Sequence, residues 1–342
     1  MKSNPAAIIE VTRGNATTQY LESLHAVDII VADASGKIVE TWGDGERAVF
    51  PRSANKALQA LLLVESGAAD AYGFAARHLA LACSSHNGEV MHTDTAREML
   101  AKAGLEETCL ECGAQLPFLA HDVQSLAEQG IPVSAIHNNC SGKHSGFVSL
   151  AKYQGLAIKD YVKFDHPLQK QIAGVLESVT GAKHGADNYG IDGCSIPTYE
   201  IPMKNLAIAY ARLGAGEDGS TSRSKAMIRL RDACMAHPEI VAGSQRFDTE
   251  LMAALGTRAF VKTGAEGVFT IAVPETGMGA VLKCRDGTTR AAEVACARIV
   301  ESILQKSDSG LSETETRALK RLTNPDLKNW NKIKVGEIRW AI

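Results

Sequence analysis

Strand-like apolar stretches lie near both ends of the 342-residue chain, and helix-like segments fill the middle. The strand-like stretches are residues 7–11, 26–32, 36–42, 267–273 and 279–284. Asp33-Ala34-Ser35-Gly36 is a good turn between the second and third of them, so this pair is predicted to form an antiparallel hairpin. A sheet completed by both chain ends, with a helical region between them, is an α+β architecture with an antiparallel sheet.

We expect one intertwined unit over residues 1–342. Its predicted parts are sheet-forming segments at about 5–50 and 255–305, a helical region at about 51–250, and a C-terminal tail at about 306–342. Within the tail, Ser312 and Glu315 have the spacing of a capping box at the start of a short helix. Apolar and polar residues alternate over residues 335–342 enough to predict a terminal strand.

Composition limits the possible partners. Apolar residues make up 45% and charged residues 22%, which is typical of a soluble globular protein. With a net charge of −3 and no basic run, nucleic acid is not an expected partner. No apolar run is long enough to span a bilayer, and the N-terminus lacks a signal-peptide pattern. We therefore expect a cytoplasmic protein whose eight cysteines are thiols or metal ligands.

One polar stretch, His137-Asn138-Asn139-Cys140-Ser141-Gly142-Lys143-His144-Ser145-Gly146, gathers a thiol, an ammonium and two imidazoles between helix-like segments. The two glycines allow a tightly bent loop, and the following helix is expected from Phe147 to Tyr153. A loop this rich in reactive groups indicates a functional site. The alternative is a polar turn in which Ser141 or Ser145 caps the next helix.

Two cysteines indicate a metal. Cys140 and Cys194 each lie in a segment rich in glycine and polar residues, and Zn²⁺ binds pairs of thiolates. The third ligand is Lys143 or His144, with water as the fourth; histidine is the ordinary choice and lysine an uncommon one. The spacing alone leaves this choice open.

A serine and a lysine begin the first predicted helix. Ser53 and Lys56 form a Ser-x-x-Lys pattern, and Lys262-Thr263-Gly264 follows much later at a strand. This order is that of penicillin-recognising serine acyl enzymes. A serine hydroxyl needs a base, and lysine is one only when burial or a second cation lowers its pKa. No Ser-Asp-Asn stands between the two patterns, which puts action on β-lactams in doubt. Ser53 alone is equally suited to a helix N-cap.

Taken together, these stretches resemble the rhizobial-type L-asparaginases, also called the thermolabile type II family. The matching stretches are Pro51-Arg52-Ser53-Ala54-Asn55-Lys56, Cys83-Ser84-Ser85-His86-Asn87-Gly88-Glu89, His137 to Gly146, Gly190-Ile191-Asp192-Gly193-Cys194, and Lys262-Thr263-Gly264. The resemblance runs from about residue 5 to about residue 305, and the tail after Gly310 lies outside it.

The resemblance implies hydrolysis of L-asparagine to L-aspartate and ammonia, a fold similar to serine β-lactamases and glutaminases, and a homodimer. It implies two catalytic pairs, Ser53 with Lys56 and Ser85 with Lys262. The implied zinc ligands are Cys140, Lys143 and Cys194, which favours lysine over histidine as the third ligand. A role in using asparagine as a nitrogen and carbon source is also expected.

As a mechanism, we expect Ser53 to attack the side-chain amide with Lys56 as base, while Ser85 and Lys262 form a relay. Ser85 as the attacking serine is the alternative. The zinc is expected to hold the α-carboxylate or α-amino end of the substrate, or else to polarise the amide. The expected substrate-binding residues are Arg52, His144 and Asp192. The rival functions are another serine amidohydrolase, such as a glutaminase or a penicillin-recognising enzyme, and a non-catalytic zinc-binding protein.

Overall fold

The computed structural model of the protein describes residues 4–15 and 17–341. Its chain divides into two compact units, each assembled from segments that are distant in the sequence. The sheet unit consists of Met1–Ala54, Ile201–Gly216 and Glu250–Ile342, and the helical unit consists of Asn55–Glu200 and Glu217–Thr249. The single intertwined unit over residues 1–342 stays a prediction.

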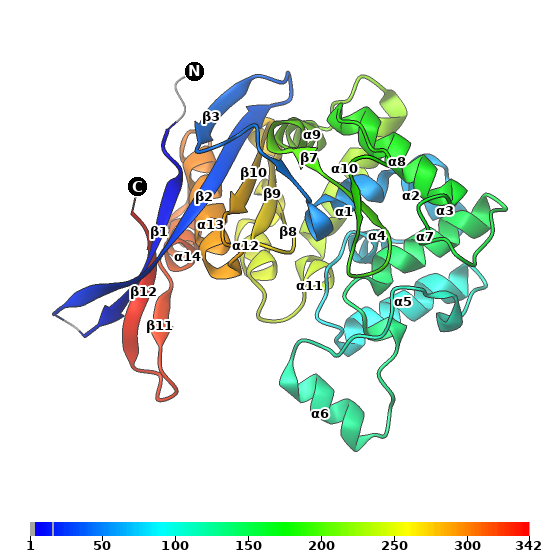
Figure 1. The fold of residues 1–342 in the computed structure, drawn as a ribbon, viewed down its shortest axis with the longest axis horizontal. Helices are drawn as coiled ribbons and strands as arrows, with labels where there is room; N and C mark the ends of the chain where they lie inside the picture. The colour runs from blue at the N-terminus through cyan, green and yellow to red at the C-terminus, as the bar shows by residue number, and fades with distance from the viewer. Residues whose placement is uncertain (1–3, 16, 342) are drawn as a thin grey trace. The chain divides into compact units, whose positions relative to one another are not determined.

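Among the described residues of the sheet unit, eight strands form one antiparallel sheet in the order β11-β12-β1-β2-β10-β9-β8, with β3 paired to β2 (Figure 1). Its strands are β1 Ala7–Gly14, β2 Gln19–Asp33, β3 Ile38–Trp42, β8 Phe260–Thr263, β9 Val268–Val273, β10 Met278–Cys284, β11 Asp326–Lys328 and β12 Lys334–Trp340, and a separate pair joins β4 Ala48–Val49 to β7 Ile201–Pro202. Its helices are α9 Met203–Ala215, α13 Thr289–Gln305, α14 Glu313–Thr323, η4 Gly256–Arg258 and η5 Pro274–Thr276. The predicted α+β class is confirmed.

Two helices pack on this sheet. Both α9 and α13 contact β2, β9 and β10, and they lie on opposite faces of it (Figure 1). This explains why every residue of β9 is buried, where a half-exposed strand would alternate. A Cβ at Gly279 would stand 2.1 Å from the backbone nitrogen of Ala211, so only glycine lets β10 and α9 approach this closely.

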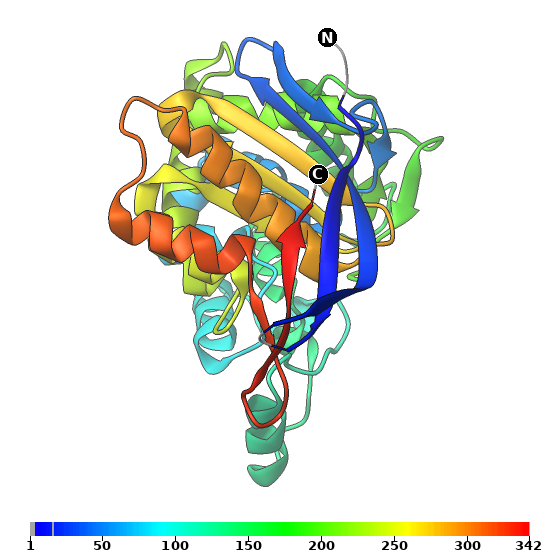
Figure 2. The ribbon, with the colours of Figure 1, turned by 90° about the vertical axis from the view of Figure 1, so that its left-hand side faces the viewer.

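The predicted hairpin is present, with β2 pairing β3 in the register Ile29↔Trp42. The predicted terminal strand is β12, which pairs β1 in the register Ile9↔Trp340 and carries the C-terminal segment into the sheet (Figure 2). Ile342, the last residue of that prediction, lies outside the described residues.

The capping box at α14 is also present. The backbone N–H of Glu315 donates to the hydroxyl of Ser312, and the backbone N–H of Ser312 donates to the carboxylate of Glu315. The two side chains therefore satisfy two N–H groups at the start of the helix, as the spacing predicts.

In the helical unit, α7 contacts α2, α3, α4 and α5. Its helices are α1 Lys56–Gln59, α2 Leu61–Glu65, α3 Ala68–Ala71, α4 Ala76–Ala82, α5 Val90–Lys102, η2 Glu107–Cys109, α6 Ala120–Glu128, η3 Ala135–His137, α7 Ser141–Tyr153, α8 Pro167–Thr180, α10 Thr221–Ala236 and α11 Pro238–Val241, and its strands are β5 Tyr189–Ile191 and β6 Pro197–Tyr199. Two elements, η1 Arg52–Asn55 and α12 Phe247–Leu255, cross the boundary between the units in the sequence.

The predicted loop before Phe147 is wrong in its extent, because α7 begins at Ser141. The two glycines serve packing rather than a bend. A Cβ at Gly142 would stand 2.3 Å from the carbonyl oxygen of Leu81 in α4, and one at Gly146 would stand 3.2 Å from Cδ2 of Leu63 in α2. Small residues therefore let α7 lie directly against two neighbouring helices.

Candidate active site and metal centre

Two cysteine sulfurs and two lysine amino nitrogens meet inside the helical unit. Cys140 is the N-cap residue of α7, and Cys194 lies in the turn between β5 and β6. Nζ of Lys143 donates to Sγ of Cys194 at 2.9 Å. Nζ of Lys56 donates to Sγ of Cys140 at 3.1 Å and to the carbonyl oxygen of Ser84 at 2.5 Å. All four site side chains are buried, so these charges interact with little screening by water.

Local structure explains how the sequence brings these groups together. Lys143 follows Cys140 by three residues, which is about one helical turn, so both lie on one side of the start of α7. The β5–β6 hairpin presents Cys194, and Ser195 after it has a φ of 76°. A non-glycine residue in this left-handed region is strained, and such strain tends to occur at functional sites. The carboxylate of Asp192 accepts from the backbone N–H of Gly193 at 2.8 Å and completes the turn.

Contacts within this buried cluster shift the pKa values of Cys140, Cys194 and Lys143. The S–H of Cys194 donates to Cys140, and this bond together with Lys143 and Lys56 lowers the pKa of Cys140 well below its usual value despite burial. The same bond and burial raise the pKa of Cys194. Burial acts to lower the pKa of Lys143, but Cys140, Cys194 and Asp192 outweigh it and raise that pKa. These shifts favour a thiolate at Cys140 beside the thiol of Cys194 and the ammonium group of Lys143.

This donor set fits zinc. In a tetrahedral zinc site, a bound nitrogen and a bound sulfur are about 3.5 Å apart, given Zn–N and Zn–S bonds of about 2.0 and 2.3 Å. The 2.9 Å between Nζ of Lys143 and Sγ of Cys194 needs only a small expansion to reach that spacing. Cys140, Lys143 and Cys194 are therefore the residues that would hold the ion. Lys143 would have to bind as the neutral amine, so metal uptake would release its proton.

His144 lies beside this cluster and has a partner that the sequence did not indicate. Its Nδ1 is 2.6 Å from the hydroxyl of Tyr161, and that hydroxyl accepts from the backbone N–H of Glu111 at 2.9 Å. The tyrosine proton is thus directed to Nδ1, which leaves the histidine proton on Nε2. Burial, then Lys143 and Lys56, lower the pKa of His144 well below its usual value, so the ring is neutral. Tyr161 stands in a stretch without a motif, and nothing in the sequence pattern would have identified it.

The turn that carries Ser53 and the Lys262-Thr263-Gly264 stretch come together within the sheet unit. A Cβ at Gly264 would stand 2.4 Å from the carbonyl oxygen of Pro51 and 3.2 Å from the backbone nitrogen of Ala54, so glycine is required for this approach. Nζ of the buried Lys262 donates to the carbonyl oxygen of Thr263 at 2.8 Å. The Ser53 turn and the Lys262-Thr263-Gly264 stretch, which the sequence analysis considered together, are thus in contact in the structure.

The backbone before Ser53 is strained. Arg52 has a φ of 52°, an uncommon conformation for a residue with a side chain. Ser53 lies in η1, and Lys56 follows as the first residue of α1. The role of Lys56 as the base for Ser53 stays a prediction, since its Nζ donates to Ser84 and Cys140.

Ser85 belongs to the helical unit, in the segment that connects α4 to α5, and its side chain is buried. Its backbone N–H donates to the carbonyl oxygen of Val241 at 2.9 Å. The next residue, His86, accepts the backbone N–H of Gly88 at Nδ1, and its Nε2 lies 3.0 Å from Oγ of Ser141. The Ser85 segment is therefore fixed against the start of α7. Lys262 belongs to the other unit, so the pairing of Ser85 with Lys262 stays a prediction.

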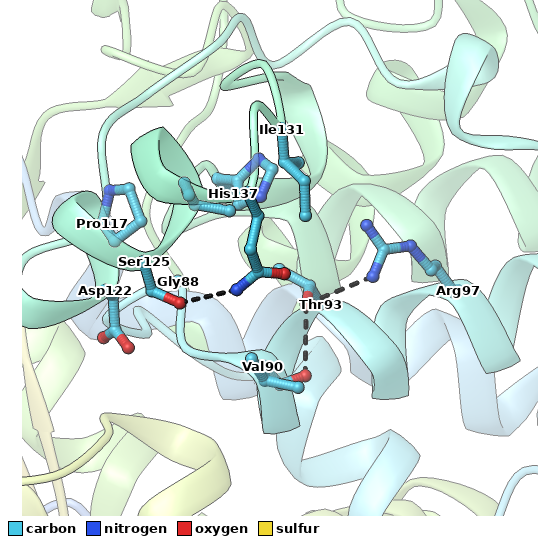
Figure 3. Close-up of a pocket in the computed structure, with 11 residues that line it drawn as sticks. Gly88, Val90, Thr93, Arg97, Pro117, Asp122, Ser125, Ile131 and His137 are labelled. Carbon is cyan, nitrogen blue, oxygen red and sulfur yellow. Dashed lines mark hydrogen bonds between the residues drawn. The ribbon is translucent and has the colours of Figure 1, made fainter.

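A cavity of about 230 Å³ also lies in the helical unit (Figure 3). Residues of α5 and of the segment around α6 form its wall, and none of the predicted site residues is among them. Arg97 beside it donates to the hydroxyl of Thr93 at 3.4 Å, and that hydroxyl donates to the carbonyl oxygen of Val90 at 3.1 Å. These polar groups already have partners within the wall.

The chain matches the L-asparaginase II family over residues 9–340, so it belongs to that family. The predicted family is confirmed, and the match extends past the predicted limit near residue 305 into the segment after Gly310. This membership indicates an enzyme of the asparaginase-type amidohydrolase class. A comparison with curated proteins finds no match.

Among solved structures, the chain is similar to Mglu in its native form, with 13% identity, a TM-score of 0.45, and coverage of 81% of this chain and 64% of Mglu. The chain thus spans somewhat less than two thirds of the length of Mglu. It is similar to a class C β-lactamase mutant with 13% identity, a TM-score of 0.42, and coverage of 81% and 92%. It is also similar to a β-lactamase from Mycobacterium bovis, with 14% identity, a TM-score of 0.38, and coverage of 77% and 88%. These TM-scores are too low to say anything about this chain's chemistry.

No described helix combines the length and the apolar character that crossing a bilayer requires.

Proposed function

We propose that the protein is an L-asparaginase that hydrolyses L-asparagine to L-aspartate and ammonia by serine–lysine chemistry. The observation that carries this proposal is the match to the L-asparaginase II family over residues 9–340. Two features of the structure support it: the contact between the Ser53 turn and the K-T-G stretch, and the buried cluster of Cys140, Lys143 and Cys194.

In the proposed reaction, the hydroxyl oxygen of Ser53 attacks the side-chain amide carbon, and neutral Lys56 accepts the hydroxyl proton. The amide C–N bond breaks, the nitrogen takes a proton and leaves as ammonia, and an acyl-enzyme remains. Water then hydrolyses this ester to give L-aspartate and free Ser53. Ser85 and Lys262 form a relay that supplies or removes protons. The reversed assignment, with Ser85 as the attacking serine, remains the alternative.

We propose that Cys140, Lys143 and Cys194 hold Zn²⁺. When bound, the ion would supply a Lewis-acid site that orients the substrate through its α-carboxylate or its neutral α-amino group. His144 presents a buried Nε2–H that has no hydrogen-bond partner among the described residues, and this donor suits a substrate carboxylate. Asp192 and Arg52 are proposed to complete substrate binding. A homodimer and a cytoplasmic location are further parts of the proposal.

The test compares Ser53→Ala with Ser85→Ala. The proposal expects Ser53→Ala to lose nearly all ammonia release from L-asparagine while remaining folded by circular dichroism. Trapping the acyl-enzyme and digesting it should place the added mass on the peptide that contains Ser53. An adduct on the Ser85 peptide would reverse the two serines, and full activity in both variants would refute serine chemistry.

The metal assignment has its own test. Cys194→Ser should lose bound zinc and lower kcat/KM for L-asparagine. Loss of zinc with unchanged kcat/KM would show that the ion serves neither binding nor catalysis. A protein that unfolds on chelation and releases no ammonia from any amide would instead be the non-catalytic zinc-binding protein.

A further inference from the structure

A second group of potential metal ligands lies in the sheet unit, where β10 ends. Cys284 is the last residue of β10, and Asp286 lies in the turn that leads to α13. His25 stands on β2, two residues before Val27, which is the partner of Cys284 in the sheet. The pairing of β2 with β10 therefore brings His25 to Cys284 and Asp286, which follow it by more than two hundred residues in the sequence.

Their ligand atoms are close together. Nδ1 of His25 is 2.5 Å from Oδ2 of Asp286, and Sγ of Cys284 is 3.0 Å from Oδ1 of the same carboxylate. One ligand atom from each of the three residues lies within 4.8 Å of the other two. His25 and Cys284 are buried, whereas the side chain of Asp286 is 49% exposed. The group is thus anchored on the protein side and open to solvent on the other.

We propose that His25, Cys284 and Asp286 form a second metal site, which takes Zn²⁺ or a similar borderline divalent cation. One sulfur, one imidazole nitrogen and one carboxylate oxygen are ordinary zinc ligands, and the exposed side leaves room for water as the fourth. Neighbouring ligand atoms of a tetrahedral zinc ion are about 3.3 to 3.6 Å apart, by the usual bond lengths. The two short distances would widen by about 0.5 to 1 Å on binding, which the exposed turn at Asp286 can accommodate.

Nucleophilic chemistry fits this group less well. Cys284 is fully buried, and its S–H donates to Asp286 rather than to the imidazole of His25. A catalytic thiol needs a base within hydrogen-bond reach and access for a substrate. The thiol of Cys284 and the imidazole of His25 both face the carboxylate of Asp286. This arrangement suits three ligands around one metal ion better than a nucleophile and its base.

Binding of a metal ion would change the present hydrogen bonds of Cys284, His25 and Asp286. The cation would replace the proton on Sγ of Cys284, which would pass to solvent, and the imidazole proton of His25 would move from Nδ1 to Nε2. Nη2 of Arg290 lies 3.1 Å from Nε2 of His25 and 3.0 Å from Oγ of Ser23. With the metal on Nδ1, Nε2 would carry a proton and could no longer accept from Arg290. That exposed guanidinium would turn to solvent, so it opposes binding.

The experiment counts zinc per chain in the full protein, after chelation, reloading with Zn²⁺ and removal of excess metal. Asp286→Asn and His25→Gln should each bind one zinc fewer than the unmutated protein, with affinity at this site weakened by roughly tenfold or more. Asp308→Asn, an exposed acidic residue of the same unit, is the matched control and should bind as the unmutated protein does. Arg290→Ala should strengthen binding, because it removes the opposing cation.

Cys194→Ser separates this site from the proposed active-site zinc. In that background, Asp286→Asn should still remove one zinc, and with Cd²⁺ it should remove a thiolate-to-metal absorption band. Equal zinc counts and equal titrations for the unmutated protein, Asp286→Asn and His25→Gln would overturn the proposal. The group would then be only a hydrogen-bonded network that closes the turn.

Discussion

The packing of α7 against α4 predicts a large effect for one added methyl group, in the variant Gly142→Ala. The new Cβ would stand 2.3 Å from the carbonyl oxygen of Leu81, 2.4 Å from its Cγ and 2.9 Å from its carbonyl carbon. Carbon atoms in contact are about 3.5 Å apart, so the helices must separate by about 1 Å. Overpacking of this kind typically destabilises by about 1–3 kcal/mol. Since two of these distances are shorter than 2.5 Å, the upper part of that range, about 2–3 kcal/mol, applies here. Alanine favours a helix over glycine by about 1 kcal/mol, so we expect a net loss of roughly 1–2 kcal/mol.

Gly174→Ala in α8 is the matched control, because Gly174 is exposed and a Cβ there has nothing within 4 Å. We expect it to stabilise the protein by roughly 0.5–1 kcal/mol, through the lower entropy of the unfolded chain and better helix propensity. Denaturant unfolding followed by circular dichroism gives both values, with the m-values compared to show that the transition is unchanged in kind. A Gly142→Ala variant as stable as the unmutated protein would refute the packing argument. Equal destabilisation by both variants would show that helical glycines matter here for another reason.

Two further variants test other parts of the fold. The buried carboxylate of Asp28 accepts from Arg285 at 2.6 Å and from Arg47 at 3.2 Å, so Asp28→Asn should lower the free energy of unfolding by about 1–3 kcal/mol at pH 7. Burial is the largest single effect on the pKa of Asp28 and acts to raise it, but the bonds from Arg285, the backbone of Asp44 and Arg47 together outweigh burial, so the pKa lies below 3.8. The stabilisation by Asp28 is therefore complete above that pH and is lost as the pH falls below it. The variant should show a flatter acid limb in urea titrations across pH. Ser312→Ala should lose about 1 kcal/mol by removing the cap of α14, and Ser312→Thr should restore most of it; no change in the thermal midpoint for the alanine variant would contradict the role of that cap.

Local patterns predicted much of the fold. The β2–β3 hairpin followed from a turn between two apolar runs, and the capping box at Ser312 from its spacing to Glu315. The Ser-x-x-Lys and K-T-G patterns predicted that Ser53 and the Lys262 stretch belong together, and the sheet brings the two stretches into contact. These features depend on residues a few positions apart or on the order of known motifs along the chain, and both can be read directly from a sequence.

What the sequence did not show depends on contacts between distant elements. Gly142 reads as a bend, and only the position of α4 reveals that it is a packing contact. Tyr161 has no motif, and its role follows from where its hydroxyl meets His144. Likewise, His25 and Asp286 come together only through the pairing of β2 with β10. A side chain placed by tertiary structure leaves no local pattern to read.

The central claim is that this chain is an L-asparaginase, and ammonia release from L-asparagine tests it most directly. The purified protein would be assayed beside L-glutamine, with and without added Zn²⁺, and with Ser53→Ala as the inactive control. The account predicts strong release from L-asparagine, little from L-glutamine, and almost none from the variant. Release from L-glutamine alone would contradict the proposed substrate, and no release from either amide by a folded, zinc-loaded sample would contradict the proposed function as a whole.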